Sequence, residues 1–158
     1  MGQIGVTEFI TLDGVAEDPG GSESLAAGGW AFQFDRGKRA TSSYTTRCSQ
    51  ATRTCSAQHD RGFAQAWPSR TGDFADRFNA LPKYVVPKTL DEGDWGDTTI
   101  LRSELSAEIA QLRKRHDRDI LVSGSIALVR SLLAADLVDE LRLMVFPDPP
   151  RHWQATVR

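Results

Sequence analysis

The stretch that decides the fold runs from residue 119 to residue 133 and reads Asp119-Ile-Leu-Val-Ser-Gly-Ser-Ile-Ala-Leu-Val-Arg-Ser-Leu-Leu133. Its first part is a short apolar run typical of a buried strand, and its last part repeats apolar residues at helical spacing. Between them, Ser123-Gly124-Ser125 predicts a tight turn. Glycine lets a backbone come close to a ligand, and a helix N-terminus offers N–H groups and partial positive charge. The turn therefore suits a cofactor phosphate, although most strand–glycine–helix turns are plain connections.

Working outward from this stretch, apolar periodicity marks further strands and helices. Strands are predicted over residues 3–12, 83–87, 98–101, 120–122 and 140–146. Helices are predicted over residues 71–81, 103–115 and 125–135, the last with an apolar face of Ile126, Val129, Leu132 and Leu133. Because strands and helices alternate through the second half, the pattern favours an α/β layer fold.

Length and composition set limits on the class of protein. A chain of 158 residues fits one domain with a real core. A net charge of −2 and a pI of about 5.9 offer no basic field for nucleic acid or an acidic membrane. No apolar run approaches the roughly 20 residues of a transmembrane helix, and no secretory signal pattern is seen, so a cytoplasmic protein is expected.

The cysteines and histidines carry little functional signal. Cys48 and Cys55 are the only two cysteines, and in a cytoplasmic protein they are expected to be free thiols. His59, His116 and His152 have no ligand spacing with them, so no metal site is expected.

Two segments do not fit the pattern of a single domain over residues 1–147. Residues 39–60 contain no Leu, Ile, Val, Phe or Met, and a loop of that length is uncommon in a compact domain. Residues 148–158 follow a well-patterned strand with Asp-Pro-Pro-Arg-His-Trp-Gln. We treat both as aberrant segments, and we expect 39–60 to form a loop.

Four pieces of the sequence together resemble the dihydrofolate-reductase-like family that includes the C-terminal reductase domain of the riboflavin-biosynthesis deaminase/reductase. They are Glu8-Phe-Ile-Thr-Leu-Asp-Gly-Val15, Gly28-Gly-Trp30, Trp67-Pro-Ser-Arg-Thr-Gly-Asp-Phe74, and Ile120 to Ser125 continuing to Leu137-Val-Asp-Glu-Leu-Arg-Leu143. Their order matches the family's small stand-alone bacterial members. The resemblance implies a mixed central sheet flanked by helices in three layers, an NADPH site, a homodimer, and hydride transfer to a pterin-like or ribosylaminopyrimidine-like ring.

The departures from the family fall on the two aberrant segments. Between Phe34 and Gly62 the family carries an apolar helix and a strand, and after Pro147 it carries Leu-Gly-x-Gly-Lys-Arg-Leu-Phe and a further strand. We therefore expect an incomplete sheet that lacks one internal strand and the C-terminal strand. A frame shift accounts for both segments. Read one base later, for example, Trp153 followed by Gln154 must give glycine. True divergence of both segments is the alternative.

The resemblance also assigns candidate site residues. Asp13 is the catalytic candidate, because a carboxylate beside the substrate ring can bond a pyrimidine edge or help deliver a proton. An aspartate in a turn that bonds its own backbone is the alternative. The substrate would contact Thr11, Asp13, Trp30 and Trp67, of which the two tryptophans wall a ring pocket or simply pack in the core. The cofactor would contact Gly14, Val15, Ser123, Gly124, Ser125 and Ile126.

Function is expected to be that of an NADPH-dependent reductase resembling 5-amino-6-(5-phosphoribosylamino)uracil reductase. Two alternatives stay open. One is a catalytically inactive nucleotide- or pterin-binding module, and the other is a frame-shifted, non-functional remnant of such a reductase. The sequence does not name the substrate, because one fold serves many reactions.

Overall fold

The computed structural model describes residues 2–21, 28–35, 52–56, 64–65, 67–86 and 97–147. The elements in chain order are β1 (Ile4–Thr11), the 3-10 helix η1 (Trp30–Gln33), β2 (Thr52–Ser56), α3 (Asp73–Ala80), β3 (Lys83–Val86), β4 (Thr98–Ile100), α4 (Leu105–Arg115), β5 (Ile120–Ser123), α5 (Ile126–Ala134) and β6 (Glu140–Phe146). The predicted strands and helices are therefore confirmed, with ends that differ by one or two residues.

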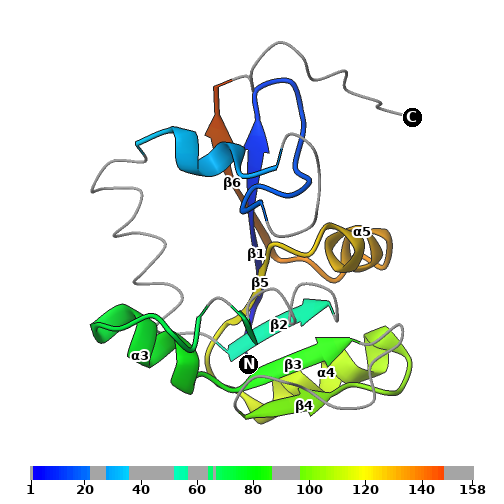
Figure 1. The fold of residues 1–158 in the computed structure, drawn as a ribbon. Coiled ribbons are helices and arrows are strands. Elements are labelled where there is room, and N and C mark those ends of the chain that lie inside the picture. The colour runs from blue at the N-terminus through cyan, green and yellow to red at the C-terminus, as the bar shows by residue number, and fades with distance from the viewer. Residues whose placement is uncertain are drawn as a thin grey trace.

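The strands form one six-stranded sheet in the order β4-β3-β2-β5-β1-β6 (Figure 1). The five pairings within the described residues are all parallel. Parallel strands end at the same edge of a sheet, so the carboxyl ends of β1, β5 and β6 all point to one edge. In open α/β sheets ligands bind at that edge.

Helices α4 and α5 cover one face of the sheet. Their buried apolar side chains pack against the alternate strand residues that point to that face. This core contains Ile4, Val6, Tyr84, Leu101, Ile109, Leu112, Ile120, Val122, Leu128, Val129 and Leu132. On α5, Leu128 replaces Leu133 as a core residue, since Leu133 is 48% exposed. The face of that helix predicted from the sequence was thus wrong at this position.

Helix α3 belongs to the opposite face. Lys83, the neighbour of Tyr84 on β3, is fully buried there, and its Nζ donates to the carbonyls of Asn79 and Leu81 at 2.7 and 2.8 Å. These carbonyls lie at the C-terminal end of α3, where a cation is favourable. With α3 and the 3-10 helix η1 on one face and α4 and α5 on the other, the sheet is the middle of three layers.

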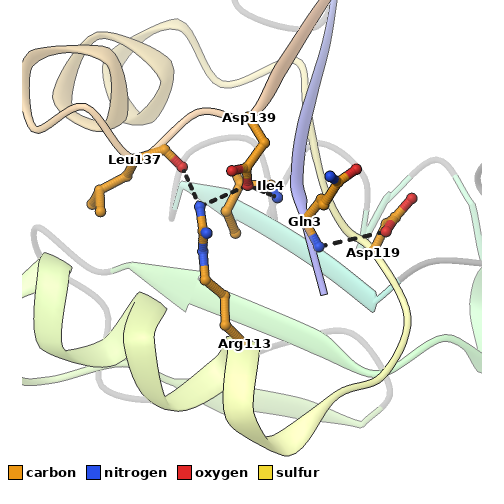
Figure 2. Close-up of polar contacts among 6 residues, drawn as sticks. All are labelled: Gln3, Ile4, Arg113, Asp119, Leu137 and Asp139. Atoms are coloured by element: carbon orange, nitrogen blue, oxygen red, sulfur yellow. Dashed lines mark hydrogen bonds and ion pairs between the residues drawn. The ribbon is translucent and has the colours of Figure 1, made fainter. Parts of the chain in front are cut away.

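A polar cluster lies at the amino edge of the sheet, opposite the carboxyl ends of β1, β5 and β6. Arg113 of α4 donates to the Leu137 carbonyl at 2.9 Å and to Asp139 Oδ2 at 2.7 Å, and the same carboxylate oxygen accepts the Ile4 N–H at 2.6 Å (Figure 2). Asp139 in turn donates its own N–H to the Ile4 carbonyl at 3.0 Å. The cluster fixes where β1 and β6 begin, which is a structural role.

The internal strand that we expected to be missing is present. Residues 52–56 form β2 in the middle of the sheet, where it pairs with β3 and with β5. The prediction that 39–60 is only a loop was therefore wrong for these residues. Two neighbouring strands offer unpaired N–H and C=O groups to whatever lies between them, and β-branched Thr52 and Thr54 suit a strand. Tertiary pairing overrides the polar composition.

The expected mixed character of the sheet would need an antiparallel strand. None occurs among the described residues, whose pairings are parallel throughout. The C-terminal strand of the family would fall in residues 148–158, which lie outside the described residues, as do Cys48, His59 and His152. Among the described helices, none has both the length and the apolar character needed to cross a membrane.

Candidate functional site

The carboxyl edge of the sheet has a step between β1 and β5. Thr7 of β1 lies opposite Ser123, the last residue of β5, and β1 continues to Thr11 alongside β6 alone. At about 3.3 Å per residue, the end of β1 lies about 13 Å further along the strand direction than the end of β5. Figure 1 shows β1 and β6 extending together beyond β5. The two predicted site turns therefore share one edge of the sheet but are displaced from each other along the strand direction. The turn after β1, which lies further out, is called the upper turn, and the turn after β5 is called the lower turn.

The upper turn follows β1 and is held by the side chain of Thr11. Thr11 Oγ1 accepts the Val15 N–H at 2.8 Å and donates to Asp13 Oδ1. The Thr11 N–H bonds the Val15 carbonyl at 2.8 Å, and the Gly14 N–H bonds the Thr11 carbonyl at 2.9 Å. Gly14 has a φ of 90°, a conformation that favours glycine. These bonds hold Thr11, Asp13, Gly14 and Val15 in one turn, and their contact with a ligand stays a prediction.

Within this turn the Asp13 carboxylate is exposed, whereas Thr11 and Val15 are buried. Asp13 bonds the side chain of Thr11 rather than its own backbone. The Thr11 hydroxyl has one proton, which both the Asp13 carboxylate and the Val15 carbonyl, at 3.2 Å, can accept, and donation to Asp13 orients the carboxylate. An exposed, oriented carboxylate can accept hydrogen bonds from a ligand or move a proton.

The lower turn joins β5 to α5 at Ser123-Gly124-Ser125. Gly124 has a φ of 69°, which a residue with a side chain rarely adopts. Ser123 and Ser125 are 6% and 3% exposed. Ser125 is the N-cap residue of α5, yet its side chain makes no capping hydrogen bond, and its buried Oγ has no partner within the described structure.

The first turn of α5 also has free backbone donors. The first hydrogen bond of the helix is from the Val129 N–H to the Ser125 carbonyl at 2.8 Å. The preceding N–H groups, those of Ile126, Ala127 and Leu128, have no partner in the part of the chain that the structure describes. Unpaired N–H groups and a free hydroxyl at a helix N-terminus are the donor set of an anion site.

One residue at this turn was not predicted as part of the site. Glu8 of β1 is 4% exposed and lies one position beyond the Thr7–Ser123 pair. Its Oε1 accepts the Ser125 N–H at 3.1 Å, so a buried carboxylate sits at the N-terminus of α5. The available signal was a glutamate that continues the inward row of β1 after the apolar residues Ile4 and Val6.

Trp30 packs in the core. It is fully buried, its Nε1 donates to the Glu17 carbonyl at 2.9 Å, and its ring meets Phe146 edge-on with centroids 5.3 Å apart. Phe9 and Phe34 pack on the same Phe146 ring. Trp30 is thus a residue of this aromatic core cluster, and its contact with a substrate stays a prediction.

Trp67 belongs to a different cluster, next to α3. Its ring lies 4.3 Å from that of Phe78, and the Arg70 guanidinium stacks over it at 4.4 Å. Its carbonyl accepts Asn79 Nδ2 at 3.1 Å. These contacts tie Trp67 to α3, and they do not bring it to the upper turn with Thr11 and Asp13. A group of three or more side chains able to hold a metal ion is not found in the described ranges.

The parallel sheet, with helices on both faces and two turns at its carboxyl edge, defines an α/β domain of three layers. The model of the RibD C-terminal domain family matches residues 3–148, and the chain belongs to this family. This membership places the chain among the oxidoreductase-type domains associated with riboflavin biosynthesis.

Solved structures agree on the fold. The chain is similar to the crystal structure of the "Putative riboflavin biosynthesis protein" from Shewanella sp. PV-4, with a TM-score of 0.70 and 17% sequence identity over 92% of this chain and 77% of that one. At this identity the likeness shows the fold alone. A search of curated proteins found no match.

Proposed function

We propose that this chain is an NADPH-dependent reductase that acts on a pterin-like or ribosylaminopyrimidine-like small molecule, in the manner of a 5-amino-6-(5-phosphoribosylamino)uracil reductase. The observation that carries the proposal is the donor set at the start of α5. Ser125 has a buried hydroxyl without a partner, next to three free N–H groups. Left without a ligand, a buried polar group of this kind costs free energy, so its presence favours a bound anion.

The residues of the lower turn fit the phosphates of a dinucleotide. The Gly124 conformation lets the backbone approach closely, and the α5 dipole favours negative charge. Ser125 Oγ and the N–H groups of Ile126 and Ala127 would donate to phosphate oxygens. When bound, the nicotinamide supplies the hydride, and the protein supplies position and electrostatics.

The upper turn fits the ring end of such a ligand. In an extended dinucleotide the nicotinamide and the phosphates are well separated. Such a ligand could therefore place its phosphates at the lower turn and its nicotinamide at the upper turn. Asp13 would bond the edge of the substrate ring or hold a proton near the reacting atom, and Thr11 would keep that carboxylate in place. Gly14 and Val15 would present their backbone to the nicotinamide carboxamide.

The test uses two serines of the same helix. NADPH fluorescence is titrated with the wild-type protein, with Ser125→Ala and with Ser131→Ala. Ser131 Oγ bonds the Ala127 carbonyl on the exposed side of α5, so its loss leaves the site intact. We expect Ser125→Ala to weaken NADPH binding by about tenfold, the value of one hydrogen bond to a charged group, and Ser131→Ala to have no effect.

Turnover then separates a reductase from an inactive module. Oxidation of NADPH in the presence of a ribosylaminopyrimidine supports the reductase, whereas tight binding without oxidation supports a binding module. Absence of NADPH binding by a folded protein contradicts the proposal and favours the remnant.

We also propose a homodimer formed through β6. Leu141, Leu143 and Val145 alternate along this edge strand and are 47%, 49% and 57% exposed. The outer edge of β6 has no strand partner among the described residues, and an unpaired edge is a template for a second copy. Sedimentation of the wild type and of Leu143→Glu tests this, with a monomeric wild type as the contrary result. Cell fractionation tests the expected cytoplasmic location.

A further inference from the structure

The N-terminus of α5 already has a carboxyl group of the protein beside it, that of Glu8. Glu8 Oε1 accepts the Ser125 N–H at 3.1 Å, and the Glu8 side chain is almost completely buried. The remaining donors of the turn are Ser125 Oγ and the N–H groups of Ile126 and Ala127. A ligand phosphate at these donors would lie next to the Glu8 carboxylate, with little water between the two charges.

Repulsion between like charges grows with each charge that the ligand brings. A phosphodiester, such as either phosphate in the bridge of a dinucleotide, carries one negative charge. A phosphomonoester has a second pKa of about 6 and carries nearly two at neutral pH. The carboxylate therefore penalises the monoester more than the diester, while the helix N-terminus attracts both.

We propose that Glu8 sets the ligand preference of this turn, so that the α5 N-terminus accepts the singly charged diester phosphates of a dinucleotide and discriminates against terminal phosphomonoesters. This inference rests on the proposed dinucleotide site. Glu8 acts here through its charge, as a specificity-determining residue, in addition to holding the turn through its hydrogen bond.

The substitution Glu8→Gln separates the two roles. The amide oxygen of glutamine can still accept the Ser125 N–H, but the negative charge is gone. The matched control is Glu104→Gln, because Glu104 accepts the Ala107 N–H at 3.2 Å at the start of another helix, α4. If Glu8→Gln fails to fold, Glu8→Met provides the same loss of charge with an apolar side chain suited to the neighbouring Ile4 and Val6.

The probes are NAD⁺, which contains only diester phosphates, and AMP, which ends in a monoester. Binding of each to the full-length chain is followed through the backbone amide resonances of Ile126 and Ala127 at constant ionic strength and neutral pH. We expect Glu8→Gln to tighten AMP binding by about three- to tenfold and NAD⁺ binding by clearly less, a range that corresponds to one added charge near a helix N-terminus. Glu104→Gln should change neither.

An unchanged ratio of the two affinities overturns the inference, as does weaker binding of both probes, which would show that Glu8 serves only to hold the turn. If that ratio is unchanged but the wild type still oxidises NADPH with a pyrimidine substrate, the inference alone is wrong. If the ratio shifts as expected in a protein without reductase activity, the preference of the turn stands and the proposed reaction is wrong. If neither probe perturbs the two amides in any variant, both the inference and the phosphate site are wrong.

Discussion

Arg113 and Asp139 are joined by an ion pair of 2.7 Å that connects the last turn of α4 to the residue before β6. The accepting oxygen of Asp139 also takes the Ile4 N–H, so one carboxylate oxygen holds a helix and the first residues of two strands. Both side chains are largely shielded from solvent, at 22% and 31% exposure.

We expect Asp139→Ala to lower the free energy of unfolding by about 2–3 kcal/mol, because it leaves a backbone N–H and a guanidinium group without their acceptor. Urea denaturation measures this. The control is Glu140→Ala, which removes a pair between neighbours on the same edge strand, Arg142 and Glu140, and should cost less than about 1 kcal/mol. Equal losses for the two variants would contradict the role given to Asp139.

Gly124 is required by its backbone conformation. With a φ of 69°, we expect Gly124→Ala to cost about 1–2 kcal/mol of stability and to weaken NADPH binding, because the lower turn must rearrange. Gly20→Ala is the control, since the added methyl group meets no atom of the described residues within 4 Å, apart from the chain neighbours, and the Gly20 φ lies outside the left-handed range. Thermal unfolding and NADPH titration should both leave Gly20→Ala close to the wild type. A Gly124→Ala protein with wild-type affinity would remove this turn from the site.

The Asp13 carboxylate is expected to serve the reaction rather than the fold. Asp13→Asn should keep the folded structure and the NADPH affinity but lower kcat by about 100-fold, the usual contribution of one acid–base group. Asp117→Asn, an exposed aspartate after α4, is the control. Steady-state kinetics with a ribosylaminopyrimidine would show the difference, and an Asp13→Asn enzyme with unchanged kcat would leave Asp13 as a turn residue only.

We expect Tyr84 to make the free energy of unfolding fall as pH rises in the alkaline range. Burial raises the pKa of its phenol above 10.0, an effect that Arg115 opposes and Asp97 reinforces. Above about pH 10 the folded state therefore keeps a proton that the unfolded state has lost, so stability falls as pH rises through the folded pKa. We expect Tyr84→Phe to flatten this fall in urea denaturation midpoints. The variant should also be less stable at neutral pH, since the phenol bonds His116 Nε2 at 2.7 Å. An unchanged alkaline slope would assign the fall to other groups.

Much of the fold could be predicted from local patterns. The strand–turn–helix over residues 120–135 has both apolar periods and a glycine at the turn, and the last strand was predicted with its observed bounds, Glu140–Phe146. The middle strand could not be predicted in this way. Central parallel strands are usually apolar throughout, and Thr52-Arg-Thr-Cys-Ser56 is not, so only its pairing with β3 and β5 defines it.

Of the candidate site, only the two backbone turns could be predicted from local patterns. Glycines at 14 and 124 mark turns because their conformations are local. The bond between Glu8 and Ser125, by contrast, joins residues 117 positions apart, and it depends on the register of β1 against β5. The packing of Trp30 is likewise set by Phe146, a residue from the far end of the chain. Contacts of this kind are decided by topology, which a local pattern does not contain.

Because of the step between the ends of β1 and β5, the two turns of the proposed site lie too far apart for a small ligand to contact both. A compact molecule can reach the turn at Asp13 or the turn at Ser125, whereas only an elongated one engages both. Once one end of such a molecule is held, attachment of the other end becomes intramolecular and gains from a high effective concentration. Either half of a dinucleotide, offered separately, should therefore bind far more weakly than the intact molecule, and adding the two halves together should not restore the affinity of the whole.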